Sequence, residues 1–227
     1  MRVAALVPAA GRGRRLGNKT PKPFIKILGK PLLVYTLENL NKAGPFHEII
    51  VAVEKGRVRS TEALLKRWGL GSARVVAGGS TRAESVRQAV FSVSDDCELV
   101  LVHDAARPAV SARCVRGVIQ AAKKSGAAVC ALPATATVKL GGPRFGKVFR
   151  TLDRRRIYLA QTPQVFGRKK LLERYRLLGK KALTATDEAA LFDGSGAAAL
   201  LVPGEAGNLK ITTAEDLRLF RFYLRQK

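Results

Sequence analysis

Residues 3–16 have the sequence VAALVPAAGRGRRL, in which a short apolar run leads directly into a glycine-rich, basic turn. A run of Val, Leu and Ala of this length is typical of a strand that helices cover on both faces. In open α/β sheets, ligands bind beyond the carboxyl ends of such strands, where the connecting turns lie. The segment therefore predicts an α/β fold whose first turn binds a ligand.

The following residues repeat this alternation of short apolar runs and longer segments with helical spacing. Strands are expected over residues 2–9, 48–53, 73–77, 99–103 and 127–132. Helices are expected over residues 31–42, 58–68, 82–92 and 111–125. This order predicts a doubly wound, mostly parallel Rossmann-like sheet. Two helix starts carry a predicted capping box, Thr81 with Glu84 and Thr212 with Glu215.

The alternation stops after Ala134. Residues 138–151 read as two short strands around a Gly-Gly-Pro turn, which predicts a hairpin inserted between core elements. Beyond it we expect a returning segment at 157–161, helices around 169–178 and 187–193, a strand at 199–203 and a helix from Thr213. No linker or repeat interrupts the chain. We therefore expect one domain over residues 1–227, with the insertion at about 136–156.

Composition restricts the class of protein. The chain has 227 residues, 47% of them hydrophobic, as folded globular proteins do. No run approaches the roughly 18 apolar residues that a membrane span needs, and the short apolar start lacks a cleavage site, so we expect a cytoplasmic protein. The widely spaced Cys97, Cys114 and Cys130 form neither a disulfide framework nor a metal knuckle, and buried thiols are expected.

The chain is strongly basic, with 41 Lys and Arg against 17 Asp and Glu and a formal charge of +24. Such an excess indicates a polyanionic partner, either nucleic acid or a phosphorylated small molecule. A nucleic-acid-binding module would interleave aromatic and basic side chains, but aromatic residues make up only 6% of the chain and form no such face. We therefore expect nucleic acid to be the less favoured partner.

The first turn matches neither familiar phosphate-binding motif. Leu16 stands where a P-loop and a dinucleotide fingerprint each need a small residue, and Glu54 follows Gly11 by 43 residues rather than about 20. Backbone amides of residues 9–13 could nevertheless approach phosphate oxygens, with Arg15 and Lys22 supplying countercharge. A solvated basic loop is the alternative interpretation.

Two further segments carry candidate functional residues, and the first lies at the same sheet edge as this turn. Asp104 follows the fourth strand and could hold Mg²⁺, because this ion is often bound by one carboxylate and substrate phosphates. A sugar hydroxyl, or a structural ion pair with Arg107, is the alternative. Lys210 lies in an expected short strand, residues 208–212, where a cation is costly without a partner. His47 and His103 are assigned no role.

The ordered motifs resemble a known family. The segments PAAGxGxR at 8–15, PK at 21–22 and GxPL at 29–32 are similar to nucleotidyltransferases that activate sugars and alcohols. Within that group, the chain resembles the 2-C-methyl-D-erythritol 4-phosphate cytidylyltransferase family of the non-mevalonate isoprenoid pathway. The resemblance runs from residue 3 to beyond 220, through GGxxRxxS at 78–85, HDAARP at 103–108, TxDR at 151–154, QTPQ at 161–164, TDEA at 186–189 and NxKIT at 208–212.

The resemblance implies transfer of CMP from CTP to 2-C-methyl-D-erythritol 4-phosphate with release of diphosphate, assisted by Mg²⁺. The implied catalytic residues are Arg15, Lys22, Arg154 and Lys210. The implied CTP contacts are Pro8, Ala9, Ala10, Gly11, Gly79, Ser85, Asp104 and Ala105. The implied contacts to the second substrate are Asp104, Arg107, Thr137, Arg154, Thr162 and Thr186.

The resemblance also implies an assembly. The hairpin is similar to the dimerisation arm of the family, and exchange of arms in a homodimer would bring Arg154 into the neighbouring subunit's site. A related cytidylyltransferase that acts on ribitol or glycerol phosphate is the alternative within the same class. It would share the nucleotide-binding turn without necessarily sharing residues 151–164.

Overall fold

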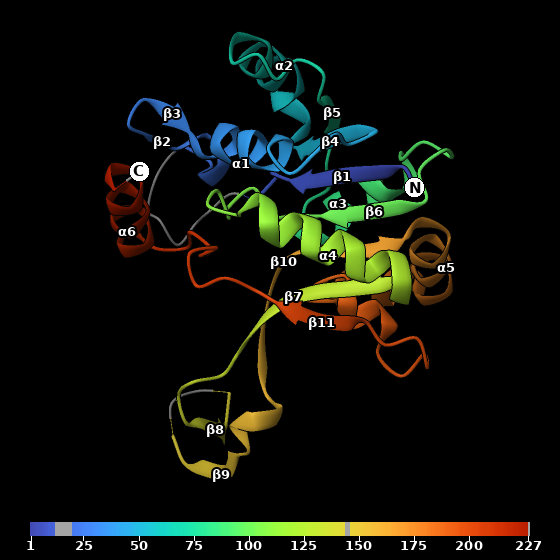
Figure 1. The fold of residues 1–227 in the computed structure, drawn as a ribbon, viewed down its shortest axis with the longest axis vertical. Coiled ribbons are helices and arrows are strands. Elements are labelled where there is room, and N and C mark those ends of the chain that lie inside the picture. The colour runs from blue at the N-terminus through green and yellow to red at the C-terminus, as the bar shows by residue number, and fades with distance from the viewer. Residues whose placement is uncertain (12–19, 144–145, 227) are drawn as a thin grey trace.

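A seven-stranded sheet runs through the centre of the molecule (Figure 1). The computed structural model describes residues 1–11, 20–143 and 146–226. The strands lie in the order β11-β7-β10-β6-β1-β4-β5. Their bounds are β1 Val3–Pro8, β4 Glu48–Val53, β5 Arg74–Ala77, β6 Leu99–Val102, β7 Ala127–Pro133, β10 Tyr158–Gly167 and β11 Leu200–Pro203. Only β10 runs antiparallel to its neighbours β6 and β7, so the sheet is mostly parallel, as predicted.

Helices cover both faces of this sheet. On one face lie α1 (Leu32–Asn41), α2 (Val58–Arg67) and α4 (Ala112–Ser125), and on the other lie α3 (Arg82–Phe91) and α5 (Arg168–Leu178) (Figure 1). Strand β1 is apolar throughout because its side chains enter the cores on both faces of the sheet. Its Ala5 and Val7 enter the first core, whereas Ala4 and Leu6 enter the second. The predicted doubly wound α/β fold is therefore confirmed.

A small third core fixes the end of the chain. It consists of buried Ile27, Leu32, Ile211 and Phe220, which come from the short hairpin β2 (Lys26–Ile27) and β3 (Lys30–Pro31), from α1 and from the region of α6 (Ala214–Arg225). The backbone N–H of Ile211 donates to the Ala106 carbonyl at 2.8 Å. This contact brings residues 208–212 beside the end of β6.

The predicted hairpin is present and stands away from the sheet (Figure 1). Strand β8 (Val138–Gly141) pairs antiparallel with β9 (Val148–Leu152), and the 3₁₀ helix η4 (Arg154–Arg156) leads back to the sheet. Leu140, Val148 and Phe149 are exposed on this hairpin. We call residues 136–156 the arm.

Several local predictions were wrong. The last helix has Thr213 as its N-cap, where the helix was expected to start, but its capping box pairs Thr213 with Asp216 and not Thr212 with Glu215, because the Asp216 carboxylate accepts the N–H groups of both threonines. Residues 208–212 form no strand, since their backbone follows the third core instead of a neighbouring strand. The helix expected at 187–193 is only the 3₁₀ helix η6, Ala189–Phe192.

Other local predictions agree with the structure in part. Thr81 caps α3 by accepting the Glu84 N–H, but the Glu84 carboxylate accepts from Ser80. The three cysteines are buried free thiols, as predicted. Across the residues that the structure describes, no helix is both long and apolar enough to cross a membrane.

Candidate active site

A pocket of about 210 Å³ opens where β1 and β6 end. Its walls combine small residues with cationic side chains and one carboxylate. The lining residues are Pro8, Ala9, Ala10, Gly11, Lys22, Pro23, Arg82, Asp104, Ala105, Ala106 and Lys210. The pocket therefore lies at the sheet edge where the sequence places a ligand.

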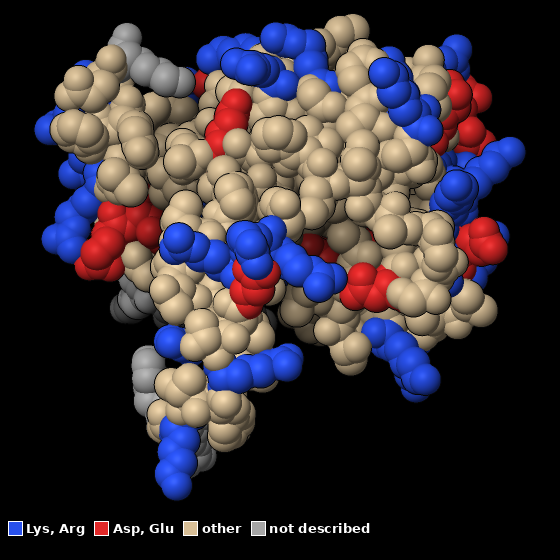
Figure 2. Space-filling model, turned by 60° about the horizontal axis from the view of Figure 1, so that its bottom comes forward, with Lys and Arg blue, Asp and Glu red and all other residues tan. Residues whose placement is uncertain are grey.

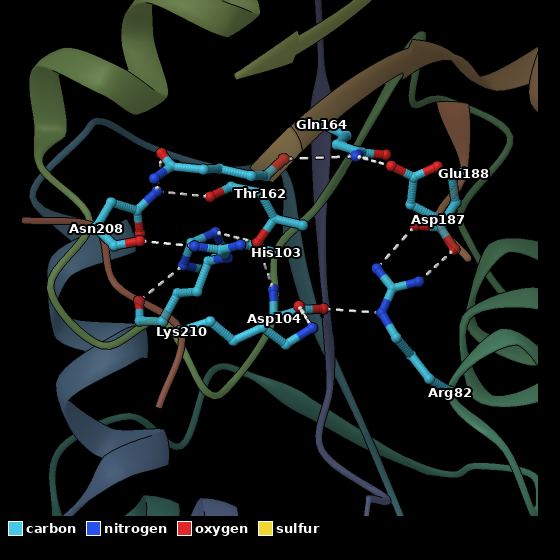
Figure 3. Close-up of polar contacts among 11 residues, drawn as sticks. Arg82, His103, Asp104, Thr162, Gln164, Asp187, Glu188, Asn208 and Lys210 are labelled. Atoms are coloured by element: carbon cyan, nitrogen blue, oxygen red, sulfur yellow. Dashed lines mark hydrogen bonds and ion pairs between the residues drawn. The ribbon is translucent and has the colours of Figure 1, made fainter. Parts of the chain in front are cut away.

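Asp104 pairs with two of the cationic side chains that line the pocket (Figure 3). Its Oδ1 accepts from Arg82 Nε at 2.8 Å, and its Oδ2 pairs with Lys210 Nζ at 2.7 Å. Burial by itself would raise the pKa of Asp104, but Arg82 and Lys210 hold it well below its usual range. The carboxylate is thus ionised, and it is the ion-pair partner of Lys210.

Arg107 does not form the structural ion pair with Asp104 that was one interpretation of the sequence. Its Nη1 donates to the Asn208 carbonyl at 2.7 Å, and the side chain is buried. Asn208 in turn donates from Nδ2 to the Thr162 carbonyl at 2.8 Å. Arg107 therefore ties the end of β6 to the segment that carries Lys210.

Arg82 also contacts Glu188, a residue to which sequence reasoning assigned no function. Nη1 and Nη2 of Arg82 donate to the two carboxylate oxygens of Glu188 at 3.0 Å each (Figure 3). Burial alone would lower the pKa of Arg82, but Asp104 and Glu188 outweigh it and raise this pKa. The signal was available in the sequence, because both residues belong to motifs that carry the family resemblance, GGxxRxxS and TDEA.

His103 positions the backbone of Asp104 through Thr162. The Asp104 N–H donates to Thr162 Oγ1 at 3.0 Å, and that hydroxyl lies 3.2 Å from His103 Nδ1. His103 Nε2 lies 3.0 Å from the Arg107 carbonyl. Because a carbonyl only accepts, we assign the ring proton to Nε2, so Thr162 donates to Nδ1. Burial lowers the pKa of His103 to about 4, which keeps the ring neutral at pH 7.

Two glycines after β5 bring the backbone close to the first turn of α3. A Cβ at Gly79 would lie 2.3 Å from Glu84 Cβ, and one at Gly78 would lie 2.7 Å from Ser85 Oγ. Neither position has room for a side chain. The Ser85 hydroxyl donates to the Thr81 carbonyl at 2.8 Å, so its oxygen is left to accept.

The structure brings together only part of the predicted site. Pro8, Ala9, Ala10, Gly11, Lys22, Asp104, Ala105 and Lys210 line the pocket. Gly79, Ser85, Arg107, Thr137, Arg154, Thr162 and Thr186 do not line it. Arg15 lies outside the described residues. Roles in catalysis and binding stay predictions for every member of both sets.

Two of the distant residues share a location. Thr137 and Arg154 are exposed at the base of the arm, where Arg154 Nη1 donates to the Thr135 carbonyl at 2.5 Å. Neither residue lines the pocket of its own chain.

The described residues do not by themselves build a resident metal site. They contain no group of three or more His, Cys, Asp or Glu side chains that could hold a metal ion. Among the described residues that line this pocket, Asp104 is the one carboxylate, and each of its oxygens already contacts a cation. A divalent ion here would need most of its oxygen ligands from a bound substrate.

Comparison with known proteins agrees with the motifs. The family model IspD, 2-C-methyl-D-erythritol 4-phosphate cytidylyltransferase, matches residues 3–226. The 2-C-methyl-D-erythritol 4-phosphate cytidylyltransferase of Syntrophus aciditrophicus is 40% identical over 228 residues, which cover 100% of this chain and 97% of that protein. A bifunctional enzyme IspD/IspF from an Anaeromyxobacter species is 43% identical over 226 residues, and the match covers 98% of this chain but 57% of that protein.

Solved structures show the same relationship. The crystal structure of 2-C-methyl-D-erythritol 4-phosphate cytidylyltransferase from Thermus thermophilus has a TM-score of 0.81 at 36% identity, and the match covers 99% of this chain and 100% of that one. The 4-diphosphocytidyl-2C-methyl-D-erythritol synthase from Anaerococcus prevotii has a TM-score of 0.83 at 30% identity, and the match covers 99% of this chain and 96% of that one. The chain therefore belongs to the 2-C-methyl-D-erythritol 4-phosphate cytidylyltransferase family, as the ordered motifs predicted, and is a cytidylyltransferase.

Proposed function

We propose that the pocket at the ends of β1 and β6 is where this chain transfers CMP from CTP to 2-C-methyl-D-erythritol 4-phosphate, with release of diphosphate. The product would be 4-diphosphocytidyl-2-C-methyl-D-erythritol, an isoprenoid precursor. The observation that carries the proposal is the meeting of Lys22, Arg82 and Lys210 with the backbone of residues 8–11 in one pocket. Three cationic side chains around small residues suit a substrate rich in phosphate.

The chemistry explains why cations and no general base dominate the pocket. A phosphate monoester has a second pKa of about 6, so the attacking phosphate is already anionic near pH 7. The obstacles are repulsion between two anions and the charge that develops on the α-phosphate. In our proposal, Lys22 and Arg15 stabilise the pentacovalent state while Lys210 holds the attacking phosphate, which is catalysis by positioning and electrostatics.

Mg²⁺ in this proposal enters with the nucleotide. It prefers hard oxygen ligands and commonly keeps substrate phosphates in its shell. When bound, it neutralises part of the triphosphate charge. Asp104 is the residue that would face the ion, and it would have to exchange Lys210 or Arg82 for the metal to make direct contact.

The arm motivates the second part of the proposal, a homodimer with exchanged arms. Leu140, Val148 and Phe149 are exposed on the arm, and burying them against a second copy would remove apolar surface from water. Arg154 and Thr137 do not line the pocket of their own chain. Exchange would deliver both to the partner's pocket and complete the substrate site there.

The other functions considered receive less support. Ribitol or glycerol phosphate could follow CTP into the same pocket, but the family model favours the methylerythritol substrate. For nucleic acid, one would expect basic side chains gathered in a single stripe, whereas Lys and Arg are dispersed over the visible face and onto the arm (Figure 2). We also propose a cytoplasmic location.

Substitution of the pocket lysines tests the proposal. Lys22→Ala and Lys210→Ala should each lower kcat by on the order of 10²-fold or more, because each removes a preorganised cation. The melting temperature should change little. Lys26→Ala is the matched control, since Lys26 is exposed and does not line the pocket. Near-normal kcat in both pocket variants, with unchanged melting temperature, would refute the assignment.

A further inference from the structure

We propose that Glu188 is a positioning residue for this reaction, acting through Arg82 on Asp104 and so on the placement of Lys210. The inference rests on the proposed function of Lys210. Glu188 does not line the pocket and is only 2% exposed, so it has no route to a substrate of its own. Its influence must pass through the side chains that it contacts.

The contacts form an unbroken row in which acidic and basic side chains alternate. Glu188 holds both terminal nitrogens of Arg82 at 3.0 Å, and the remaining Nε of Arg82 reaches Asp104 Oδ1 at 2.8 Å. Asp104 Oδ2 then pairs with Lys210 Nζ at 2.7 Å. Of the four side chains, Lys210 is the most exposed, at 41%. The row therefore begins in the core and ends at the pocket.

Because the guanidinium group of Arg82 is rigid, its contacts with Glu188 determine where its third nitrogen points. Its N–H groups lie in one rigid plane, so two bonds to Glu188 fix the direction in which Nε points. Asp104 is the group at which Nε points, and its second oxygen is thereby aimed at Lys210. Loss of the Glu188 carboxylate would leave Arg82 in contact with Asp104 alone. Asp104 would then be drawn toward Arg82 and would hold Lys210 less well.

Glu188 is itself held firmly in place. The segment around it is tied to β10, because Gln164 donates from Nε2 to Asp187 Oδ2 at 2.7 Å and accepts the Ala189 N–H at 3.2 Å. Gln164 lies two residues beyond Thr162 on the same strand. The Glu188 carboxylate is therefore fixed to the strand that also holds the Asp104 backbone. A carboxylate in such a place can set the orientation of Arg82.

The test is a double-mutant cycle between Glu188→Gln and Lys210→Ala in the full-length protein. Glu188→Gln keeps the shape of the side chain and should lower kcat by roughly 10- to 100-fold, as loss of a supporting group commonly does. The KM for CTP should stay within about threefold. In the Lys210→Ala background, Glu188→Gln should cause no further loss of kcat, because its effect passes through the absent lysine.

The control is Glu38→Gln. Glu38 also pairs with a cation, Lys30 at 2.8 Å, but on α1 and outside the pocket. This variant should lose less thermal stability than Glu188→Gln, because its ion pair is partly exposed, and it should keep the wild-type kcat. If Glu188→Gln does not fold, Glu188→Asp replaces it in the cycle, because the shorter side chain keeps the carboxylate but cannot hold both terminal nitrogens of Arg82 in the same place.

The outcomes separate the two proposals. If Lys210→Ala is impaired while Glu188→Gln retains the wild-type kcat, the role of Glu188 is wrong and the proposed function stands. The same holds if the two losses multiply in the double variant, since Glu188 would then act independently of Lys210. Wild-type activity of Lys210→Ala would overturn the proposed role of Lys210 and the inference together.

Discussion

Acidification should destabilise this protein through one buried histidine. His103 is fully buried and neutral, and burial lowers its pKa from 6.5 to about 4. In the unfolded chain the same ring has an ordinary pKa, so between these two values the unfolded state binds the proton and the folded state does not. The free energy of unfolding must therefore fall as the pH drops from about 6.5 towards 4.

The size of the effect follows from the shift. A change from 6.5 to about 4 corresponds to roughly 3 kcal/mol at 1.36 kcal/mol per pKa unit. About 2 kcal/mol of this should be lost between pH 7 and pH 5, where the unfolded ring becomes protonated and the folded ring does not. This loss is a large fraction of the stability of an ordinary domain.

Urea unfolding at pH 7 and pH 5 measures the effect in the wild type and in His103→Gln. The carboxylates titrate similarly in both proteins, so the difference between the two pH responses isolates His103. The wild type should lose about 2 kcal/mol more than the variant. A pH response of the same size in both proteins would refute the buried, neutral state of His103.

Two further predictions concern the charge and the arm. If the positive surface serves CTP, added salt should raise the KM for CTP more than it lowers kcat, because screening weakens the encounter of charged species. Steady-state assays from low to physiological salt measure both constants. Specific binding of duplex DNA in place of CTP would contradict this prediction. If arms are exchanged, mixing inactive Lys22→Ala with inactive Arg154→Ala subunits should restore roughly a quarter of all sites after free reassortment. An inactive mixture despite proven exchange, or a monomer by light scattering, would place Arg154 within its own chain.

The local sequence predicted the βα alternation well because each element carries its own apolar period and helix-start signals. The prediction from local sequence failed where two possible capping pairs compete. Thr212 and Thr213 are each followed by an acid three residues later, and only the backbone geometry selects Asp216 as the partner. It also did not predict that β10 runs antiparallel, since strand direction depends on how the arm returns the chain to the sheet.

The sequence predicted residues of the site but not the contacts between their side chains. Residues 8–11 and Asp104 were expected at one sheet edge with Lys22 as countercharge, and the family resemblance added Lys210. The structure places all of them in one pocket. The contact between Arg82 and Glu188 joins residues 106 positions apart, which no local pattern encodes. Only the folded sheet brings these two side chains together.

Transfer of CMP to one polyol phosphate in preference to others can be assayed with the purified protein. The purified protein should be incubated with CTP, Mg²⁺ and, in separate reactions, 2-C-methyl-D-erythritol 4-phosphate, ribitol phosphate or glycerol phosphate, with release of diphosphate measured. We expect diphosphate and a cytidylylated product with the methylerythritol substrate and little of either with the other two. Preferred turnover of ribitol or glycerol phosphate, or no diphosphate with any of the three, would contradict it.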